Sequence, residues 1–332
     1  MPAQILFLQV SRIGDTLFAT PAIRAVARAF PDARITVLAH PKRAEVLEHL
    51  PFIHRVGRIT KKSAPWRGRL GGRTYDLAFV YGHDEPLVAY ALRVARKVVA
   101  FQQADASLNQ ALDIALPVPE FQNQHAVHHY LRLPATQGVA PAGYRLSYQV
   151  LPEEREWADA RLAAEGFQGQ RPLVGLQVAS FPTRAYRDWP VAHFRELCGR
   201  ISAQWPAARF LIFGGPEERE RTAWLKEQLG SRAALFAGAL TLRQTGALMS
   251  RTHLYVGVDT GPTHLMSTFD IPLVGLYHCT SSSAHTGPLD HPMAELLNHP
   301  LSGTGRCSEQ SAMADIGVDE VFAAVRRLLK EQ

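Results

Sequence analysis

The sequence predicts an α/β protein with two doubly wound parallel-sheet domains, and three observations support this. Of its 332 residues, 46% are hydrophobic and 20% are charged, which is typical of a folded globular chain. The length favours two domains, because a domain usually holds roughly 100 to 200 residues. Apolar, β-rich runs also alternate with helical patterns almost from end to end, as they do in βαβ units.

The first half of the chain contains short apolar runs that predict strands and longer periodic runs that predict helices. Residues 5–10 form an apolar run far shorter than the roughly 20 residues of a membrane-spanning helix, and no basic stretch precedes it as in a signal peptide. We therefore expect a buried strand there. The predicted strands are 5–10, 35–39, 77–81 and 97–101, and the predicted helices are 16–29 and 125–137.

The second half repeats this alternation. Pro190 and Thr241 precede two of its helical runs and are suitable helix starts. The predicted strands are 173–178, 210–213, 254–258 and 273–277, and the predicted helices are 153–165, 191–204, 217–229, 242–250 and 318–330. We expect an N-terminal domain at 1–155, a C-terminal domain at 156–315, and a final segment at 316–332 whose helix packs back on the first domain.

In two such domains facing each other, ligands bind at the carboxyl ends of the strands, along the cleft between the domains. Residues that carry chemistry should therefore follow strands directly. Ser11, Gly14 and Asp15 follow the first predicted strand and open a helix. Asp15 is an ordinary helix cap by one interpretation, since Asp is a favoured capping residue. By the other it is a general base, because a carboxylate ionised at neutral pH accepts a proton from an attacking hydroxyl.

The predicted strand at 254–258 runs directly into Asp259, Thr260 and Gly261, and a helix containing His264 follows. The backbone N–H groups of Thr260 and Gly261 at such a helix start, with its partial positive charge, favour a phosphate. The structural alternative is that Asp259 and Thr260 are cap residues and that His264 is a packing residue.

Two more turns follow strands of the second half. In residues 214–217 two glycines admit close backbone approach, and Glu217 is placed to accept hydrogen bonds from a ribose, although Gly-Gly-Pro is also a generic turn. The loop at 180–190 contains Thr183 and Arg187. A cation in this loop would neutralise a leaving diphosphate, and Arg187 is the favoured candidate.

Positive charge is concentrated in the first half. Residues 1–150 hold 18 Lys and Arg against 10 Asp and Glu, a net charge of +8, whereas the rest of the chain has −2. The acid-free segment 55–73, with Trp66 at its middle, is either a solvated loop or a clamp for a phosphorylated or carboxylated acceptor. Nucleic acid is not expected, because no matching binding motif occurs and the cations are confined to one loop. These cations are Arg55, Arg58, Lys61, Lys62, Arg67, Arg69 and Arg73.

Several absent motifs exclude other functions. No GxGxxG follows a strand, and no P-loop, HExxH or GxSxG motif occurs, which removes the usual signatures of dinucleotide oxidation, P-loop hydrolysis, zinc proteases and serine hydrolases. Cys198, Cys279 and Cys307 are not spaced as CxxC, so we expect neither a disulfide framework nor a zinc site, and a reducing compartment fits. The 14 histidines are scattered, and no metal site is predicted.

Taken together, these motifs resemble glycosyltransferase family 9, the heptosyltransferases that extend lipopolysaccharide cores with ADP-heptose. The resemblance covers nearly the whole chain. The pair Ser-x-x-Gly-Asp and Asp-Thr-Gly-Pro-x-His is specific in combination, although neither half is specific alone. The matching residues are 5–8, 11–15, 20–24, 30–33, 75–77, 125, 130–131, 188–190, 214–217, 259–264 and 286–288.

The resemblance implies a GT-B architecture, with two Rossmann-like domains that hold the acceptor on the N-terminal side and the donor nucleotide on the C-terminal side. It implies inversion at the anomeric carbon, no metal or other cofactor, and Asp15 as the general base. The segment 55–73 corresponds to an acceptor-binding loop. The implied donor contacts are Thr260 and Gly261 to the diphosphate, Glu217 to the ribose, Asp259 to the sugar, and additionally Ser11, Gly14, Thr183 and His264.

The chain departs from the family pattern in two places. Arg187 stands before Asp188-Trp189 where well-studied members carry a Lys, so a planar fork replaces a point charge. Residues 277–281 replace the more usual Phe-Gly-Pro-Thr beside the nucleotide. These departures bear on donor geometry and on the preferred base or sugar.

We therefore expect a cytoplasmic inverting heptosyltransferase in which Asp15 activates an acceptor hydroxyl and Arg187 assists departure of the diphosphate. Its expected partners are ADP-heptose and an anionic lipopolysaccharide core acceptor. The basic domain also permits peripheral contact with the inner face of the inner membrane. The alternatives are a related transferase with another donor or a protein acceptor, and a non-catalytic carbohydrate-binding protein on the same scaffold.

Overall fold

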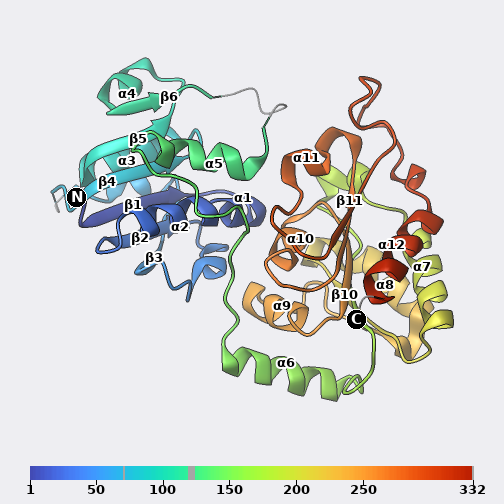
Figure 1. The fold of residues 1–332 in the computed structure, drawn as a ribbon. Helices are drawn as coiled ribbons and strands as arrows, with labels where there is room; N and C mark the ends of the chain where they lie inside the picture. Colours follow the sequence, from blue (N-terminus) through green and yellow to red (C-terminus); the bar gives the residue numbers. More distant parts are fainter. Residues whose placement is uncertain (70–71, 119–123, 331–332) are drawn as a thin grey trace. The chain divides into compact units, whose positions relative to one another are not determined.

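The computed structural model of the chain describes residues 1–69, 72–118 and 124–330 (Figure 1). They form two compact units, Met1–Gln149 and Val150–Gln332. Within the described residues each unit contains one six-stranded sheet in which every pairing is parallel. The prediction of an α/β chain with two doubly wound parallel-sheet domains is confirmed.

The sheet of the first unit has the order β3-β2-β1-β4-β5-β6. Because the strand order reverses between β1 and β4, the topological switch point lies at the carboxyl end of β1, where Ser11 to Asp15 follow. The strands are β1 (Gln4–Gln9), β2 (Arg34–Ala39), β3 (Arg55–Arg58), β4 (Tyr75–Tyr81), β5 (Ala95–Phe101) and β6 (Ile114–Leu116).

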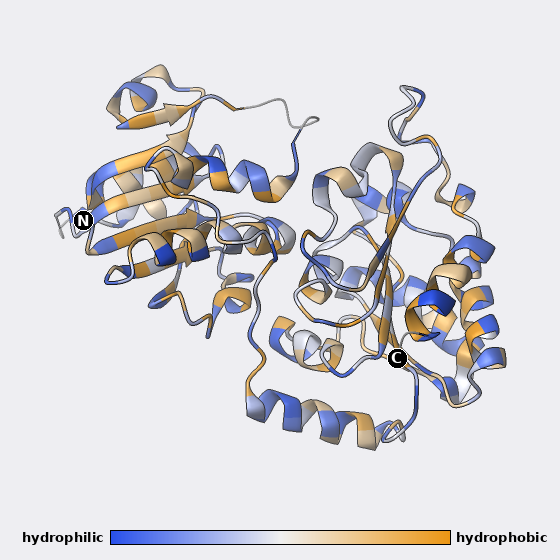
Figure 2. Cartoon of the chain, in the orientation of Figure 1, coloured by the Kyte–Doolittle hydropathy of each residue, from blue (hydrophilic) through white to orange (hydrophobic). Residues whose placement is uncertain are grey.

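Alternate residues of β1 face opposite sides of this sheet, and helices cover both sides. Leu6 and Leu8 belong to a core cluster with residues of α3 (Glu85–Val94), whereas the Phe7 ring packs on Tyr81, which contacts Tyr130 of α5 (Ala126–Ala135). Burial on both faces explains why the strand is apolar along almost its whole length, as the hydropathy colours show (Figure 2). The unit also contains α1 (Ile13–Phe18), α2 (Thr20–Ala29), α4 (Ala106–Ala111) and the 3₁₀ turns η1 (Ala44–Leu47) and η2 (Ala64–Trp66).

The helix predicted at 16–29 is two helices. The first, α1, ends at Phe18, and α2 begins at Thr20 with Pro21 in its first turn. Proline has no N–H to donate to the carbonyl four residues earlier, so a continuous helix would lose that hydrogen bond and its ring would clash with the preceding turn. Pro21 is well tolerated where it lies, at the start of a new helix.

The sheet of the second unit has the order β12-β11-β10-β7-β8-β9. Its switch point lies between β7 and β10, so the segments after these two strands flank the position where a doubly wound domain binds its ligand. These segments begin at Val178 and Asp259. The strands are β7 (Leu173–Gln177), β8 (Arg209–Phe213), β9 (Ala233–Leu235), β10 (Leu254–Val258), β11 (Leu273–Tyr277) and β12 (Ala294–Asn298).

The helices of the second unit agree closely with the predictions at 191–204, 242–250 and 318–330. Thr241 caps its helix through a hydrogen bond from the Gln244 N–H to its side chain, as expected for a capping box. The α-helices are α6 (Pro152–Ala164), α7 (Val191–Gln204), α8 (Arg219–Leu229), α9 (Leu242–Met249), α10 (Gly261–Met266), α11 (Ser283–Thr286) and α12 (Val318–Lys330). The 3₁₀ turns are η4 (Pro182–Arg187), η5 (Pro216–Glu218), η6 (Gly230–Arg232), η7 (Cys279–Ser281) and η8 (Met313–Asp315).

The C-terminal helix α12 belongs to the second unit, which corrects the prediction that it packs back on the first domain. Val321 and Val325 lie in one core cluster with Leu254 of β10 and Leu276 of β11. Alternation of polar and apolar residues along a helix predicts one buried face but does not identify the surface that buries it.

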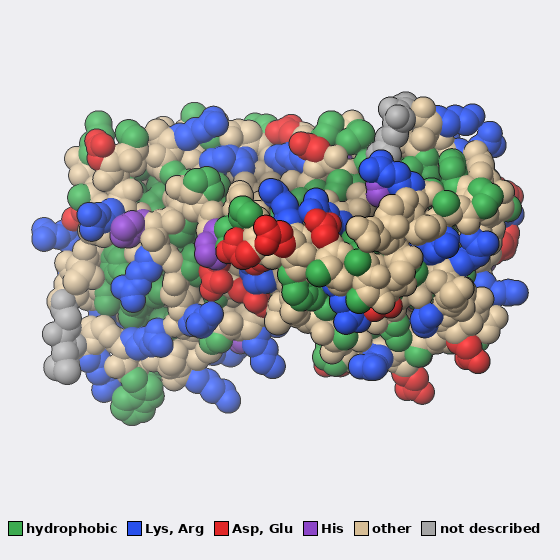
Figure 3. Space-filling view, turned by 90° about the horizontal axis from the view of Figure 1, so that it is seen from below, with side chains coloured by type: hydrophobic (Ala, Val, Ile, Leu, Met, Phe, Trp, Pro, Cys, Tyr) green, Lys and Arg blue, Asp and Glu red, His purple; other side chains and the backbone are tan. Residues whose placement is uncertain are grey.

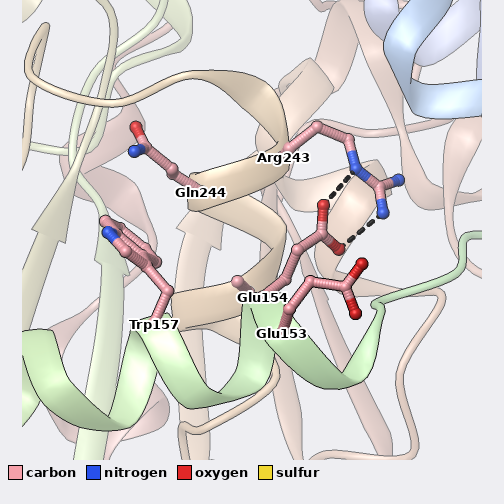
Figure 4. A pocket seen from close by; sticks show the side chains of 6 residues that line it. Glu153, Glu154, Trp157, Arg243 and Gln244 are labelled. Carbon is pink, nitrogen blue, oxygen red and sulfur yellow. Dashed lines mark hydrogen bonds and ion pairs between the residues drawn. The ribbon is translucent and has the colours of Figure 1, made fainter.

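The boundary between the units falls after Gln149 rather than at 155, because α6 packs on α9 of the second unit. Arg243 of α9 donates two hydrogen bonds to the Glu154 carboxylate, from Nε to Oε1 at 2.7 Å and from Nη2 to Oε2 at 2.5 Å (Figure 4). The pocket beside this pair has about 140 Å³, well below the roughly 300 Å³ at which small-molecule sites begin. We therefore interpret this pocket as part of the contact that holds α6 against α9, and not as a ligand site.

Among the described residues, every helix is too short or too polar to cross a bilayer.

Candidate active site

Asp15 lies in the first turn of α1, directly beyond the carboxyl end of β1. Its side chain does not cap the helix: the capping position is Arg12, and the Asp15 Oδ2 atom accepts a hydrogen bond from the Ser11 hydroxyl at 2.6 Å. The interpretation of Asp15 as an ordinary cap is therefore wrong. Asp15 is partly exposed and Gly14 is buried beside it. Among the residues that the structure describes, only Oδ2 of this carboxylate accepts a hydrogen bond, which leaves Oδ1 to accept a proton.

Buried polar groups of the first unit support the backbone at this turn. The Gln9 side-chain amide donates to the Asp15 carbonyl oxygen at 2.9 Å and to the Tyr130 hydroxyl at 3.0 Å. Tyr130 is buried, and burial together with the nearby Asp15 charge raises its pKa, so the phenol stays neutral. Sequence reasoning missed Gln9, because a Gln at the end of an apolar strand has no characteristic pattern.

His129 of α5 lies near the same turn and stacks on Phe101, with 4.3 Å between ring centroids. Burial, assisted by the nearby Arg132, lowers its pKa from 6.5 to about 4. Below pH 6.5 the unfolded chain binds a proton here that the folded chain does not accept until about pH 4. The neutral ring is therefore the stable form in the folded protein across this interval.

We expect His129 to reduce stability progressively as the pH falls from about 6.5 to about 4. The loss should be on the order of 1 to 3 kcal/mol, and it should be absent in His129→Phe, which keeps an aromatic ring on Phe101 and cannot titrate. Urea unfolding of both proteins at pH 7 and pH 5 measures the difference. An equal loss of unfolding free energy in the two proteins would show that another group is responsible.

In the second unit, Asp259 follows β10 and is the centre of a buried polar cluster. Its Oδ2 atom accepts from the Ser281 hydroxyl at 2.6 Å and lies 3.4 Å from Arg187 Nη1. Its Oδ1 atom accepts from Thr286 at 3.1 Å and lies 3.3 Å from His264 Nε2. Burial opposes ionisation, but hydrogen bonds from His264 and Ser281 and the Arg187 charge outweigh it and hold the pKa of Asp259 below its ordinary value.

Thr260 is the N-cap of α10, and its side chain makes no capping hydrogen bond. Thr260 is therefore the cap residue by position, as one interpretation expected, but among the described residues neither its side chain nor that of Asp259 satisfies the helix N–H groups. The first N–H groups of a helix have no intrahelical acceptor, so those of Thr260 and Gly261 remain available to an anion. His264 is buried but acts as a partner of Asp259 rather than as an apolar packing residue.

Arg187 ends the turn η4 after β7, which brings it to Asp259 across the switch point of the second sheet. Its side chain is 18% exposed, and its guanidinium carbon lies 5.5 Å from the centre of the Tyr186 ring. The buried Nε atom has no hydrogen-bond partner among the described residues. Arg187 therefore neutralises Asp259 with one nitrogen and retains donors for a second anion.

The rest of this loop is held by Asp188. Its Oδ1 atom accepts from the N–H and hydroxyl groups of Ser180, at 2.7 and 2.5 Å, and Arg221 of α8 pairs with Oδ2. Burial raises the pKa of Asp188, although the Ser180 hydrogen bonds and the Arg221 charge act against that rise. Thr183 is exposed at the outer side of η4, and the structure does not bring it to Asp259.

At the turn after β8, Glu217 is exposed and its neighbour Glu218 is buried. Glu218 accepts hydrogen bonds from the Gly215 N–H at 2.8 Å and from the Gln177 side chain at 3.3 Å, and burial raises its pKa. The sequence prediction missed Glu218, which organises the turn. Glu217 is exposed and lies at the carboxyl edge of the same sheet, since it follows β8.

A disulfide joins Cys279 and Cys307, whereas the cysteine spacing led us to expect no disulfide framework and a reducing compartment. It connects η7, directly after β11, to the loop that follows β12, and His278 Nε2 lies 2.9 Å from the Ser311 carbonyl oxygen of that loop. Ligand atoms of His278, Cys279 and Cys307 lie within 4.8 Å of one another. With the two sulfurs bonded to each other, neither is a thiolate, the form that ligates a metal.

Reducing this disulfide should lower the free energy of unfolding by about 3 to 4 kcal/mol, since the cysteines are separated by 28 residues and the bond restricts that loop in the unfolded chain. Chemical denaturation with and without a dithiol reductant measures the loss. The matched control is Cys307→Ser, which should have the lower stability at the outset and show no further response to reductant. A reductant effect of the same size in Cys307→Ser would contradict the assignment.

Within the basic segment 55–73 the structure divides the cations between two places. Arg58 lies 3.4 Å from Glu48, and Lys61 lies 3.3 Å from Asp84, which directly precedes α3. Arg67 and Arg69 lie farther along, beyond η2. All the predicted acceptor-binding residues, Arg55, Arg58, Lys61, Lys62, Arg67 and Arg69, are exposed.

The predicted donor residues also fall into separate groups. Ser11 and Gly14 lie with Asp15 in the first unit, whereas Asp259, Thr260, Gly261, His264 and Arg187 come together in the second. Ser281 and Thr286, which complete the Asp259 cluster, were not predicted as ligands of this carboxylate. They lie 22 and 27 residues from Asp259, and only the pairing of β10 with β11 makes them neighbours.

Comparison with known proteins supports a family assignment. The family model described as Glycosyltransferase family 9 (heptosyltransferase) matches residues 67–315. Lipopolysaccharide heptosyltransferase 1 of Pseudomonas aeruginosa is 26% identical over 321 residues, which cover 89% of this chain and 86% of that protein.

Two solved structures share the whole fold. A family 9 glycosyltransferase from Veillonella parvula matches with a TM-score of 0.84 at 20% identity, covering 99% of this chain and 98% of the other. The ADP-heptose lps heptosyltransferase II of E. coli matches with a TM-score of 0.79 at 20% identity, covering 99% of each chain. The chain therefore belongs to glycosyltransferase family 9, the heptosyltransferases, and has the two Rossmann-like domains of the GT-B fold.

Proposed function

We propose that this glycosyltransferase moves a heptose from ADP-heptose to a hydroxyl of an acidic lipopolysaccharide core acceptor, with inversion at the anomeric carbon. The names of the relatives support the donor and acceptor. The observation that carries the mechanism is the Asp15 carboxylate, which lies at the switch point of the first sheet, bound by Ser11 and not used as a helix cap.

In the proposed step, Asp15 accepts the proton of the acceptor hydroxyl as its oxygen bonds to the anomeric carbon. The bond from that carbon to the diphosphate oxygen breaks, and its electron pair leaves with ADP. Because the acceptor attacks from the face opposite the diphosphate, the configuration is inverted. Ser11 holds Oδ2 of the base, so Oδ1 is the atom that takes the proton.

Charge develops on the departing diphosphate, and the Asp259 cluster supplies groups that stabilise it. The spare donors of Arg187 and the N–H groups of Thr260 and Gly261 are positive groups fixed before the reaction, which lowers the cost of reorganisation. Asp259 and His264 would bind hydroxyls of the sugar, and Glu217 those of the ribose. We propose that these groups replace a metal ion, so transfer should continue in the presence of a chelator.

The acceptor would approach the first unit, where Lys61 and Lys62 follow β3 and therefore lie toward the sheet edge that carries Asp15. Cations there would attract an acidic core sugar. We propose that the enzyme works on the cytoplasmic side of the inner membrane, where it would meet a lipid-linked acceptor.

The test is mass-spectrometric detection of a heptose on core-lipid acceptor after incubation of purified protein with ADP-heptose. Addition of one heptose supports the proposal. Sugar transfer from another nucleotide sugar, or to a protein, would replace it with a different transferase activity. Thermal shift can detect donor binding, because a ligand at about 100 times its dissociation constant stabilises the folded protein by roughly 2.7 kcal/mol. Donor binding without transfer to any acceptor would identify a non-catalytic binding protein.

A further inference from the structure

The basic segment 55–73 is continuous in sequence, but its second half lies away from the edge that carries Asp15. The helix α3 starts directly after Asp84, which pairs with Lys61 at the carboxyl edge of the first sheet. It ends at Val94, and β5 begins at the next residue, so its last turn lies at the amino edge. Ten residues of helix span about 15 Å.

The backbone around Arg67 lies beside that last turn. Arg93 of α3 donates from Nη2 to the carbonyl oxygens of Ala64 at 2.7 Å and Arg67 at 3.2 Å. A Cβ on Gly68 would lie 2.5 Å from Val94 Cγ1. The second half of the segment is therefore about one helix length from the edge where an acceptor hydroxyl would meet Asp15, and it is poorly placed to bind the reacting sugar.

Trp66 is presented outward by an ordered turn and is 74% exposed. Reciprocal hydrogen bonds between Thr60 and Ser63 precede it, and Ala64 is buried beneath it. The Arg69 guanidinium lies 4.8 Å from the ring centre, and its Nε atom donates to the Pro65 carbonyl oxygen at 2.8 Å. A Trp ring with this exposure contributes little to folding through burial, which favours a role in binding.

The charge around this ring is positive and largely uncompensated. The acids Glu48 and Asp84 pair with Arg58 and Lys61, in the half nearer the carboxyl edge. Arg67 and Arg69 follow Trp66 directly, and Arg73 lies just before β4, at the amino edge of the same sheet. All three are exposed and, among the described residues, without an ion pair to an acid. Lys and Arg side chains are prominent over the first unit, on the left of Figure 3.

We propose that Trp66, Arg67, Arg69 and Arg73, the Trp66 surface, dock the enzyme on a bilayer with anionic headgroups. Indole rings favour the interface between headgroups and acyl chains, where one end is apolar and the other wet. Cations near such a surface are attracted to anionic lipid within a Debye length. A single ring inside a cation cluster fits this interface better than nucleic acid, which takes a track of several stacked aromatics.

If the Trp66 surface docks on the bilayer, binding of the acceptor falls to the cations nearer the carboxyl edge, such as Lys61 and Lys62. Docking would also hold the enzyme beside a lipid-linked acceptor. The inference does not depend on the transfer reaction. Vesicle binding is measured without turnover, so its failure would leave the proposed function untouched, and failure of heptose transfer would leave docking untouched.

The experiment is co-sedimentation of the full chain with vesicles made of equal parts phosphatidylglycerol and phosphatidylcholine, or of phosphatidylcholine alone. The wild type should bind the anionic vesicles, more weakly at high salt, and bind the neutral vesicles little. Trp66→Ala should lower the affinity for anionic vesicles several-fold. The double variant Arg69→Glu/Arg73→Glu should lower it by at least roughly 25-fold, since each cation contributes roughly a factor of five to this affinity.

Matched controls come from α8 of the second unit. Trp224 is 39% exposed and Arg219 is exposed, so Trp224→Ala and Arg219→Glu make the same kinds of change elsewhere on the chain. Both should bind as the wild type does. Binding at the wild-type level by the Trp66 and Arg69/Arg73 variants would overturn the proposal. Equal binding of the wild type to both kinds of vesicle would do so as well. So would displacement of the protein from vesicles by a short RNA that binds the same residues.

A fluorescence measurement keeps the test decisive if a variant folds poorly. The chain has five Trp residues, so the signal of Trp66 is the difference between the wild type and Trp66→Phe. Anionic vesicles should shift that difference signal to shorter wavelength, because the indole moves into a less polar medium. An unshifted signal with protein bound to the vesicles would show that another surface makes the contact and would overturn the proposal.

Discussion

Asp15→Asn should abolish heptose transfer while leaving ADP-heptose binding nearly unchanged. The amide has almost the shape of the carboxylate and can still accept from the Ser11 hydroxyl, but it cannot take the proton of the acceptor. A positioned base usually contributes about 10²- to 10⁴-fold, so a loss of that size in kcat is expected. Turnover is measured by release of ADP, and donor binding by thermal shift.

The matched control is Ser11→Ala, which removes the hydrogen bond to Oδ2 and keeps the base. It should slow transfer much less than Asp15→Asn does. If Asp15→Asn keeps more than a tenth of wild-type turnover, another group is the base and Asp15 has only a structural role.

Arg187→Met is expected to lower kcat by about 10²- to 10³-fold, the usual effect of removing one preorganised donor to developing charge. Arg187→Lys should recover part of this loss, because an ammonium keeps the charge but cannot bind Asp259 and the diphosphate through separate nitrogens of one planar group. Steady-state kinetics with ADP-heptose should show the effect mainly in kcat.

Arg184→Met tests whether the effect belongs to Arg187 or to any cation of η4. Arg184 bonds to the Tyr186 hydroxyl and not to Asp259, so its removal should change kcat little. Thermal unfolding of Arg187→Met is needed beside the kinetics, since Asp259 loses a charged partner and, within the described part of the chain, keeps His264, Ser281 and Thr286. Equal kcat losses in the two variants would refute a specific role for Arg187.

The sequence was sufficient to predict the inner strands of both sheets but not the outer ones. β10 and β11 are found where they were expected, because burial on both faces requires continuous apolar runs. The strands missed are β3, β6, β9 and β12, and these are the four edge strands. An edge strand is short and half-exposed, so Arg-Val-Gly-Arg in β3 has no apolar periodicity to detect.

Similar reasoning explains which parts of the candidate site were found. Asp15 and Asp259 follow inner strands directly, so their positions came from local sequence alone. Ser281 and the pairing of Cys279 with Cys307 depend on contacts between distant segments, which spacing cannot specify. At 217–218 the sequence offered two adjacent glutamates, and only the packing of the turn decided which one is buried.

The disulfide at Cys279 has a thermodynamic consequence, because Ser281, two residues along η7, donates its hydroxyl to Asp259. The thiol–disulfide equilibrium and the ligand binding proposed at Asp259 would thus act on the same short turn. Coupling between two equilibria is reciprocal. If reduction of the disulfide changes the affinity for a ligand at Asp259 by some factor, binding of that ligand changes the equilibrium constant for reduction by the same factor. Measuring the midpoint potential of the Cys279–Cys307 disulfide with and without ADP would give the size of this coupling.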